Sequence, residues 1–141
     1  MRFASLALPL ACLAVTACVT DSDDAGGVAA SVDALTGTRW TFVSIDGDDP
    51  ASDKAFLQFR EDGIGLSAGC NGVGGDWSIE DGRLIGGPYM STQMYCEGLM
   101  EQEGALAALL EERPHITLMG ERMALEGTGH RAQLKRAGNA Q

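Results

Sequence analysis

Basic residues are scarce in this sequence. Ten Lys and Arg stand against twenty Asp and Glu, which gives a formal net charge of −10 at pH 7. Nucleic-acid binding needs Lys and Arg to neutralise phosphates, so this balance argues against it. It also argues against electrostatic docking on anionic lipid, so attachment to a membrane would have to be covalent. Solubility is the simplest role of an acidic surface, and a cationic protein partner stays open.

Long apolar runs are missing as well. An uncharged apolar stretch covers residues 3–13, directly after Met1-Arg2, and no other segment approaches its length. It is about half as long as the ~20 residues that a membrane-spanning helix needs. A positive start, a short apolar stretch and small residues before a cysteine are typical of an export signal. The sequence therefore predicts a signal peptide at residues 1–17.

The residues around Cys18 leave two ways of processing open. Val15-Thr16-Ala17-Cys18 resembles a bacterial lipobox, in which the cysteine is lipidated and becomes the mature N-terminus. Ordinary cleavage after Ala17 is the alternative, because Val-Thr-Ala also fits the small-x-small rule. We favour lipidation of Cys18, since a cysteine directly after the cleavage point has little other role. Val19 follows Cys18 in place of aspartate, which by resemblance to Gram-negative lipoprotein sorting favours the outer membrane, facing the periplasm.

The composition predicts one folded domain. Residues 18–34 are small and polar without an aromatic residue, which predicts a flexible tether with at most a helical turn at residues 28–30. Residues 35–137 are enough for a single domain, and residues 138–141 are expected to fray.

The predicted fold class is α+β. Turn-forming dipeptides separate short stretches of alternating hydrophobicity, which is typical of antiparallel strands. We expect seven to eight strands, with Trp40, Phe42 and Ser44 on one face of the first. Residues 97–112 carry one apolar helical face, and Pro114 closes the element. The prediction is a curved antiparallel sheet, partly closed like a barrel, with one packed helix.

Cysteines are few, and two of the four fall within the predicted export segment or the lipobox. The remaining pair, Cys70 and Cys96, is expected to form a disulfide in an exported domain. Such a bridge closes a loop of about 26 residues and stabilises by roughly 3.5 kcal/mol. A redox-active pair is the alternative, but active dithiols are usually close in sequence, as Cys-x-x-Cys. Zinc would need two further ligands at plausible spacing, and none stand near.

Asn71, Thr92 and Met94 flank these cysteines and form a possible binding rim. A disulfide would bring the two loops side by side as one edge of a ligand or partner site. The simpler interpretation is a backbone role, with Asn71 in a left-handed turn and Thr92 bonded to main chain. Both interpretations stay open.

No catalytic, metal-binding or cofactor-binding residues are predicted. His115 and His130 are interpreted as surface residues, because no triad partner motif accompanies them. Residues 127–132 match the dinucleotide fingerprint formally, but no βαβ unit can follow them. An Asp-rich turn begins at Asp46, but Leu57 stands where a calcium loop needs its bidentate glutamate. Four helix carboxylates are interpreted as a solvated face: Glu101, Glu103, Glu111 and Glu112.

Several motifs, taken in order, resemble the META domain (HslJ-like) family. They are the opening Leu35-Thr36-Gly37-Thr38-Arg39-Trp40, then Gly69-Cys70-Asn71, then Thr92-Gln93-Met94-Tyr95-Cys96, Met100-Glu101 and Leu109, and the closing Met123-Ala124-Leu125 and Leu134. Tyr95 departs from the alanine that is common there. The resemblance implies a mixed sheet with a helix in a small, stress-related bacterial envelope protein, often a lipoprotein. The family has no established catalytic residues to carry over.

The sequence thus favours a non-enzymatic, lipid-anchored envelope protein that binds another envelope protein, or a small apolar ligand between helix and sheet. An acidic periplasmic inhibitor of a cationic hydrolase such as lysozyme is the alternative. A thiol-redox protein is a third hypothesis.

Overall fold

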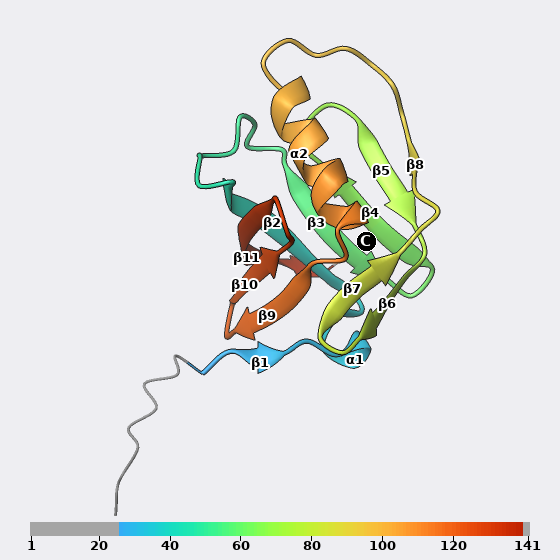
Figure 1. Cartoon of the computed structure of the whole chain (residues 1–141), viewed down its shortest axis with the longest axis vertical. Helices are drawn as coiled ribbons and strands as arrows, with labels where there is room; N and C mark the ends of the chain where they lie inside the picture. The colour runs from blue at the N-terminus through green and yellow to red at the C-terminus, as the bar shows by residue number, and fades with distance from the viewer. Residues whose placement is uncertain (1–25, 140–141) are drawn as a thin grey trace, which may run out of the picture.

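The computed structural model of the chain describes residues 26–139 (Figure 1). Cys18, the predicted signal peptide and most of the predicted tether therefore lie outside the described residues. The elements are β1 (Val28–Ala29), α1 (Val32–Leu35), β2 (Thr38–Ile45), β3 (Phe56–Arg60), β4 (Gly63–Ser67), β5 (Gly72–Gly75), β6 (Trp77–Glu80), β7 (Arg83–Gly86), β8 (Met90–Ser91), α2 (Met100–Glu111), β9 (His115–Met119), β10 (Arg122–Glu126) and β11 (Arg131–Asn139).

The strands form one curled antiparallel sheet, a half-barrel that bends around α2 (Figure 1). Its order is β6-β7-β9-β10-β11-β2-β3-β4-β5-β8, and β1 adds to β9. The α+β class and the curved antiparallel sheet are confirmed, but the sheet has eleven strands in place of seven to eight. The strands β1 and β8 have two residues each, too few for an alternating pattern, and β5 reads Gly-Val-Gly-Gly.

A β-bulge in β2 changes which side chains face the core. Phe42 pairs with Leu134 and Ser44 pairs with Gln133, so Val43 is the extra residue. Beyond a bulge the alternation restarts. Ile45 is therefore buried together with Trp40 and Phe42, while Ser44 is only half-buried. The expectation that Ser44 shares the face of Trp40 and Phe42 was wrong for this reason.

The attached part of the chain begins before residue 35. Val28 and Ala29 pair with Leu118 and Thr117 of β9, in place of the expected helical turn. Ala30 is buried, and Leu35 at the end of α1 is fully buried. At the other end, Gly138 and Asn139 pair with β2 where we expected fraying. Burial and strand pairing thus extend the domain at least from residue 28 to residue 139.

Helix α2 fills the concave side of the sheet. The sequence placed it at residues 97–112, and the structure has it at Met100–Glu111, after a turn closed by the Leu99 N–H on the Cys96 carbonyl (3.2 Å). Leu106, Leu109 and Leu110 face the sheet, each at most 1% exposed. Side chains therefore fill the space between helix and sheet. Neither helix within residues 26–139 has the length and apolar character to cross a membrane.

Candidate functional site

The predicted disulfide between Cys70 and Cys96 is present. The two Cα atoms lie 6.1 Å apart, and the bridge joins the β4–β5 connection to the turn before α2. Residues 90–96, which we call the stapled loop, are thereby fastened to the sheet at both ends, through β8 at one end and Cys96 at the other.

Asn71 also holds the stapled loop in place, through hydrogen bonds of its side-chain amide. Its side chain is 2% exposed. The Oδ1 atom accepts hydrogen bonds from the Met94 N–H (2.7 Å) and the Thr92 hydroxyl (2.9 Å). The Nδ2 atom donates to the Met94 carbonyl (2.8 Å) and to Glu103 Oε1 (2.5 Å). All four hydrogen-bonding positions of the amide are thus used, so Asn71 supports the loop and has none free for a ligand.

The expected left-handed turn at Asn71 was wrong. Among the described residues other than glycine, positive φ occurs at Asp46, Asp81 and Arg113, and nearby it is Gly69 that has φ 116°. A Cβ at Gly69 would also collide with Ser52, which explains why glycine stands there.

Thr92 and Glu103 complete the support. The Thr92 hydroxyl accepts from the Gly72 N–H (3.1 Å), which matches its predicted main-chain role. Glu103 Oε2 accepts from the Asn71 N–H (3.1 Å). Glu103 therefore links α2 to the β4–β5 connection through Asn71. Our interpretation of Glu103 as part of a solvated helix face was wrong.

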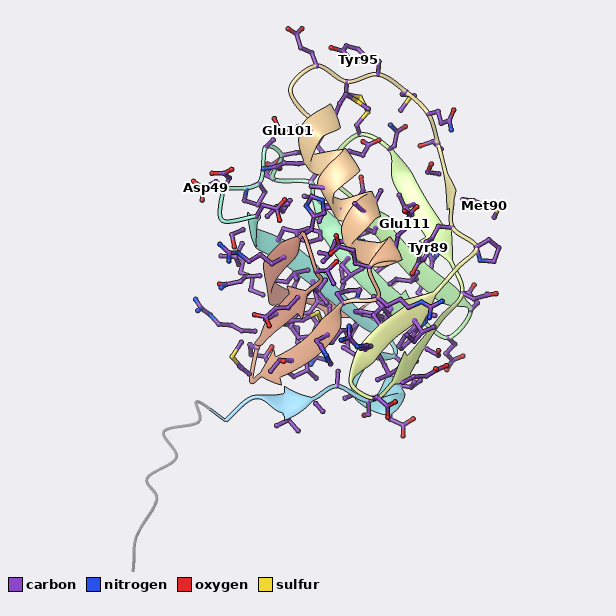
Figure 2. All side chains as sticks on the ribbon, in the orientation of Figure 1. Asp49, Tyr89, Met90, Tyr95, Glu101 and Glu111 are labelled. Atoms are coloured by element: carbon purple, nitrogen blue, oxygen red, sulfur yellow. A yellow bond between two sulfur atoms is a disulfide. The ribbon has the colours of Figure 1, made fainter. Side chains whose placement is uncertain are left out.

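The stapled loop displays apolar side chains while its backbone is held. Met90 is 78% exposed, Met94 59% and Tyr95 82%, and every residue from 90 to 95 is exposed (Figure 2). The three residues of the predicted rim thus have different roles in the structure. Asn71 and Thr92 hold the backbone of the loop, whereas the Met94 side chain is exposed to solvent. Met90 and Tyr95 are exposed on the same loop, and the sequence analysis did not include them in the rim because nothing in their pattern separates exposure from burial.

The segment of the chain that carries the stapled loop is acidic. No Lys or Arg occurs between Arg83 and Arg113, whereas five Glu do. Glu97 and Glu101 are exposed, and Glu101 lies at the same end of the molecule as Tyr95 (Figure 2). At the β8 end, burial and then the neighbouring Glu111 raise the pKa of Tyr89.

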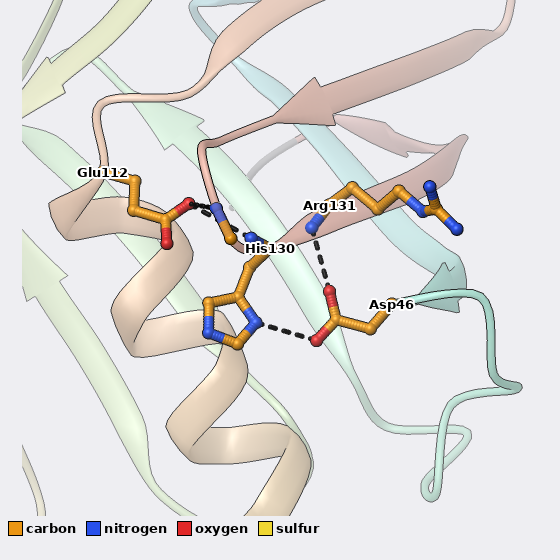
Figure 3. Close-up of polar contacts among 5 residues, drawn as sticks. Asp46, Glu112, His130 and Arg131 are labelled. Atoms are coloured by element: carbon orange, nitrogen blue, oxygen red, sulfur yellow. Dashed lines mark hydrogen bonds and ion pairs between the residues drawn. The ribbon is translucent and has the colours of Figure 1, made fainter.

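A second polar cluster joins the β10–β11 turn to α2 and β2 (Figure 3). Asp46 Oδ2 lies 2.8 Å from His130 Nδ1, and Asp46 Oδ1 accepts from the Arg131 N–H (2.9 Å). Glu112 Oε2 accepts from the N–H groups of Gly129 (3.0 Å) and His130 (3.2 Å). His130 is partly exposed and is paired with Asp46, whereas Glu112 accepts hydrogen bonds from the turn and is not merely solvated as we had interpreted it. A cavity of about 530 Å³ lies beside the cluster, lined by Asp46 and residues 126–131.

Two glycines let the turn close around the Glu112 carboxylate. A Cβ at Gly127 or at Gly129 would collide with that carboxylate. The pattern that formally matched a dinucleotide fingerprint thus encodes a turn that holds an internal carboxylate. The hydrogen bond from the Gly129 N–H lowers the pKa of Glu112. Burial raises this pKa by less, and the hydrogen bond from the His130 N–H lowers it further.

The Asp46–His130 pair is expected to make stability depend on pH. The hydrogen bond to Asp46 outweighs burial and raises the pKa of His130 above 6.5. Burial raises the pKa of Asp46, but the bonds from His130 and Arg131 together hold it below 3.8. The His130 contribution is full below pH 6.5 and is lost as pH rises through the raised value. The Asp46 contribution is full above pH 3.8 and is lost as pH falls through the lowered value.

Denaturant unfolding at about pH 5.5 and about pH 8 measures this dependence. The wild-type chain should lose stability between the two, and Asp46→Asn should reduce that loss while tolerating the left-handed backbone at this position (φ 53°). His115→Gln is the control and should leave the Asp46–His130 part of the loss in place. An unchanged loss in Asp46→Asn would show that the pair does not contribute.

Asp46 and Glu112 hold the β10–β11 turn against β2 and α2 through these hydrogen bonds. In the described part of the chain, no hydroxyl or thiol is hydrogen-bonded to the His130 imidazole. Within residues 26–139, no group of three or more His, Cys, Asp or Glu is arranged to hold a metal ion. The described residues thus define a small, disulfide-bonded α+β half-barrel with an exposed, rigidly supported loop.

The chain belongs to the META domain family, whose sequence model matches residues 33–139. Among solved structures, one NMR structure of a protein is similar at 24% identity and a TM-score of 0.70, covering 77% of this chain and 97% of the other. A second, of a protein from Burkholderia xenovorans, has 21% identity and a TM-score of 0.57, covering 75% of this chain and 86% of the other. At these identities the likeness shows the fold alone. No curated protein matches the sequence significantly.

Proposed function

We propose that this chain is a non-enzymatic, lipid-anchored envelope protein whose META domain binds another envelope protein through the stapled loop. The observation that carries the binding role is that this loop is both exposed and fixed. Met90, Met94 and Tyr95 are displayed on a backbone held by the disulfide and Asn71. A preorganised loop loses little conformational freedom on binding, and exposed apolar side chains supply the contact area.

A protein partner fits better than a small apolar ligand. The buried leucines of α2 already occupy the space between helix and sheet, where such a ligand would have to sit. The stapled loop, in contrast, offers its apolar side chains on an open surface.

The lipid anchor is supported by the sequence Val15-Thr16-Ala17-Cys18. The intact mass of detergent-extracted protein, measured after thiol alkylation with and without reduction, tests it. We expect a chain that starts at Cys18, carries acyl groups and takes up alkylating reagent only after reduction. A mass without lipid would contradict the anchor, and two thiols alkylated before reduction would contradict the disulfide in the cell.

The binding role is tested in the cell with a photo-crosslinking residue. Placed at Met94, it is expected to give a discrete protein adduct. Placed at the control position Val43, which is 37% exposed on β2, it should not. Equal labelling at both positions would argue against the stapled loop as the binding surface.

Inhibition of a cationic hydrolase is a second candidate. The acidic segment that carries the stapled loop favours it, because a basic enzyme would be attracted to that side. Excess protein added to lysozyme at about micromolar concentration provides the test. Full residual lysis would exclude lysozyme as the target.

A further inference from the structure

We propose that the open edge of β8, continued by the stapled loop, binds an extended, basic segment of a partner protein as an added strand. This inference names the kind of partner and rests on the binding role proposed above.

The first argument is the open edge. Strand β8 ends the sheet and pairs on one side with β5, through Ser91 with Val73 and Met90 with Gly74. The Thr92 N–H points inward to the Gly72 carbonyl (3.1 Å). Because antiparallel strands alternate, the N–H and C=O of Ser91 point outward. An open edge with unpaired backbone groups is the template for strand addition.

The second argument is that this edge carries no charged residue. Residues 89–96 read Tyr-Met-Ser-Thr-Gln-Met-Tyr-Cys. Edges that must stay unpaired are commonly guarded by charged side chains. The opposite edge of the sheet, β6, follows this rule, since Asp76, Glu80 and Asp81 are exposed on and beside it. Of these two ends of the sheet, the β8 edge is therefore the one that can accept a further strand.

The third argument is charge complementarity. Glu97 and Glu101 lie toward one end of the stapled loop, Glu111 lies near Tyr89 at the other, and no Lys or Arg occurs between residues 83 and 113. A second copy would bring the same carboxylates to the interface, and an anionic membrane would be repelled. A partner strand with Lys or Arg at its ends and apolar side chains opposite Met90 and Tyr95 matches the edge.

The position of the Cys96 end of the stapled loop is consistent with a protein partner. The turn that follows the stapled loop lies at the end of the molecule away from β1 and α1, where the described chain begins (Figure 1). A domain anchored from its N-terminal side would present this turn away from the membrane.

Fluorescence anisotropy tests the proposal with the purified full chain in detergent. The probe is a labelled ten-residue peptide with Val and Tyr in its middle and two Lys at each end. One comparison peptide has Asp in place of Lys, and another carries N-methyl groups on alternate backbone nitrogens, which block strand addition. We expect the basic peptide to bind more weakly as salt rises, and both comparison peptides to lose binding. Equal binding of the acidic or the N-methylated peptide would overturn the proposal.

Variants locate the binding surface. Tyr95→Ala should weaken binding of the basic peptide roughly tenfold, as expected for an aromatic anchor. The double variant Glu97→Gln/Glu101→Gln should weaken it chiefly at low salt. Glu80→Gln, on the opposite edge, is the matched control and should bind like the wild type. Slower exchange of the Ser91 amide in the presence of peptide would support strand addition directly, and unchanged exchange would contradict it.

Two other occupants are outcomes of the same experiments. Self-association that Tyr95→Ala abolishes would replace the partner with a second copy and overturn the proposal. Binding to phosphatidylglycerol vesicles that Tyr95→Ala abolishes would do the same in favour of a membrane. If peptide binding fails while the Met94 crosslink persists, the binding role stands and only the strand-addition inference falls.

Discussion

Removing the disulfide between Cys70 and Cys96 is expected to lower the free energy of unfolding by about 3.5 kcal/mol. The bridge closes a sequence separation of 26 residues and fixes the loop before α2. For a domain of this size, whose total stability is about 5–15 kcal/mol, the loss is large. Denaturant unfolding of Cys70→Ala/Cys96→Ala measures it, and hydrogen exchange should show that residues 92–98 open first.

Reduction of the wild-type protein provides the control. It should reproduce the loss seen in the double variant, and the same reductant should not change the double variant itself. A loss below about 1 kcal/mol would mean that the bridge does not brace the fold. Such a result would favour the thiol-redox hypothesis over a structural bridge.

The substitution Asn71→Ala is expected to lower the free energy of unfolding by about 3 kcal/mol. The truncation removes the partners of the Met94 N–H, the Met94 carbonyl and the Glu103 carboxylate at a site where Asn71 is 2% exposed. Buried polar groups left without partners cost more than the net value of the bonds themselves. Denaturant unfolding checks the value, and Thr92→Val, which removes two of the bonds, should cost less.

The two supports of the stapled loop should be coupled. Asn71 and the disulfide fix the same backbone, so Asn71→Ala should lower the free energy of unfolding less in the Cys70→Ala/Cys96→Ala variant than in the wild type. Strictly additive losses would show that the amide and the bridge act on independent parts of the fold.

Local chemistry made part of this structure predictable. Two cysteines in a domain that is predicted to be exported are expected to pair, and a helical period without β-branched residues predicts α2. The three Asp-Gly dipeptides favour positive φ at their aspartates, and Asp46 and Asp81 adopt it whereas Asp62 does not. None of these inferences needs knowledge of a distant neighbour in the sequence.

The remaining features depend on such neighbours. His130 meets Asp46 across 84 residues, and Asn71 meets Glu103 across 32, without any periodic signal. The short strands β1 and β8 exist because a longer strand is available to pair with them, not because of their own composition. The exposure of Tyr95 likewise depends on the disulfide and on Asn71, which hold the loop. The sequence therefore predicted the cysteines and the possible rim, but not which rim residues face outward.

The two-residue pairing of β1 with β9 has a mechanical consequence. A pull on the N-terminal side of the domain reaches Val28 and Ala29 first, before Leu35 and the core behind it. Detachment of residues 28–34 would release at most about 25 Å of extended chain, while the buried Leu35 stays in place. Tension at the N-terminus would therefore extend residues 28–34 before it reaches the buried core of the domain.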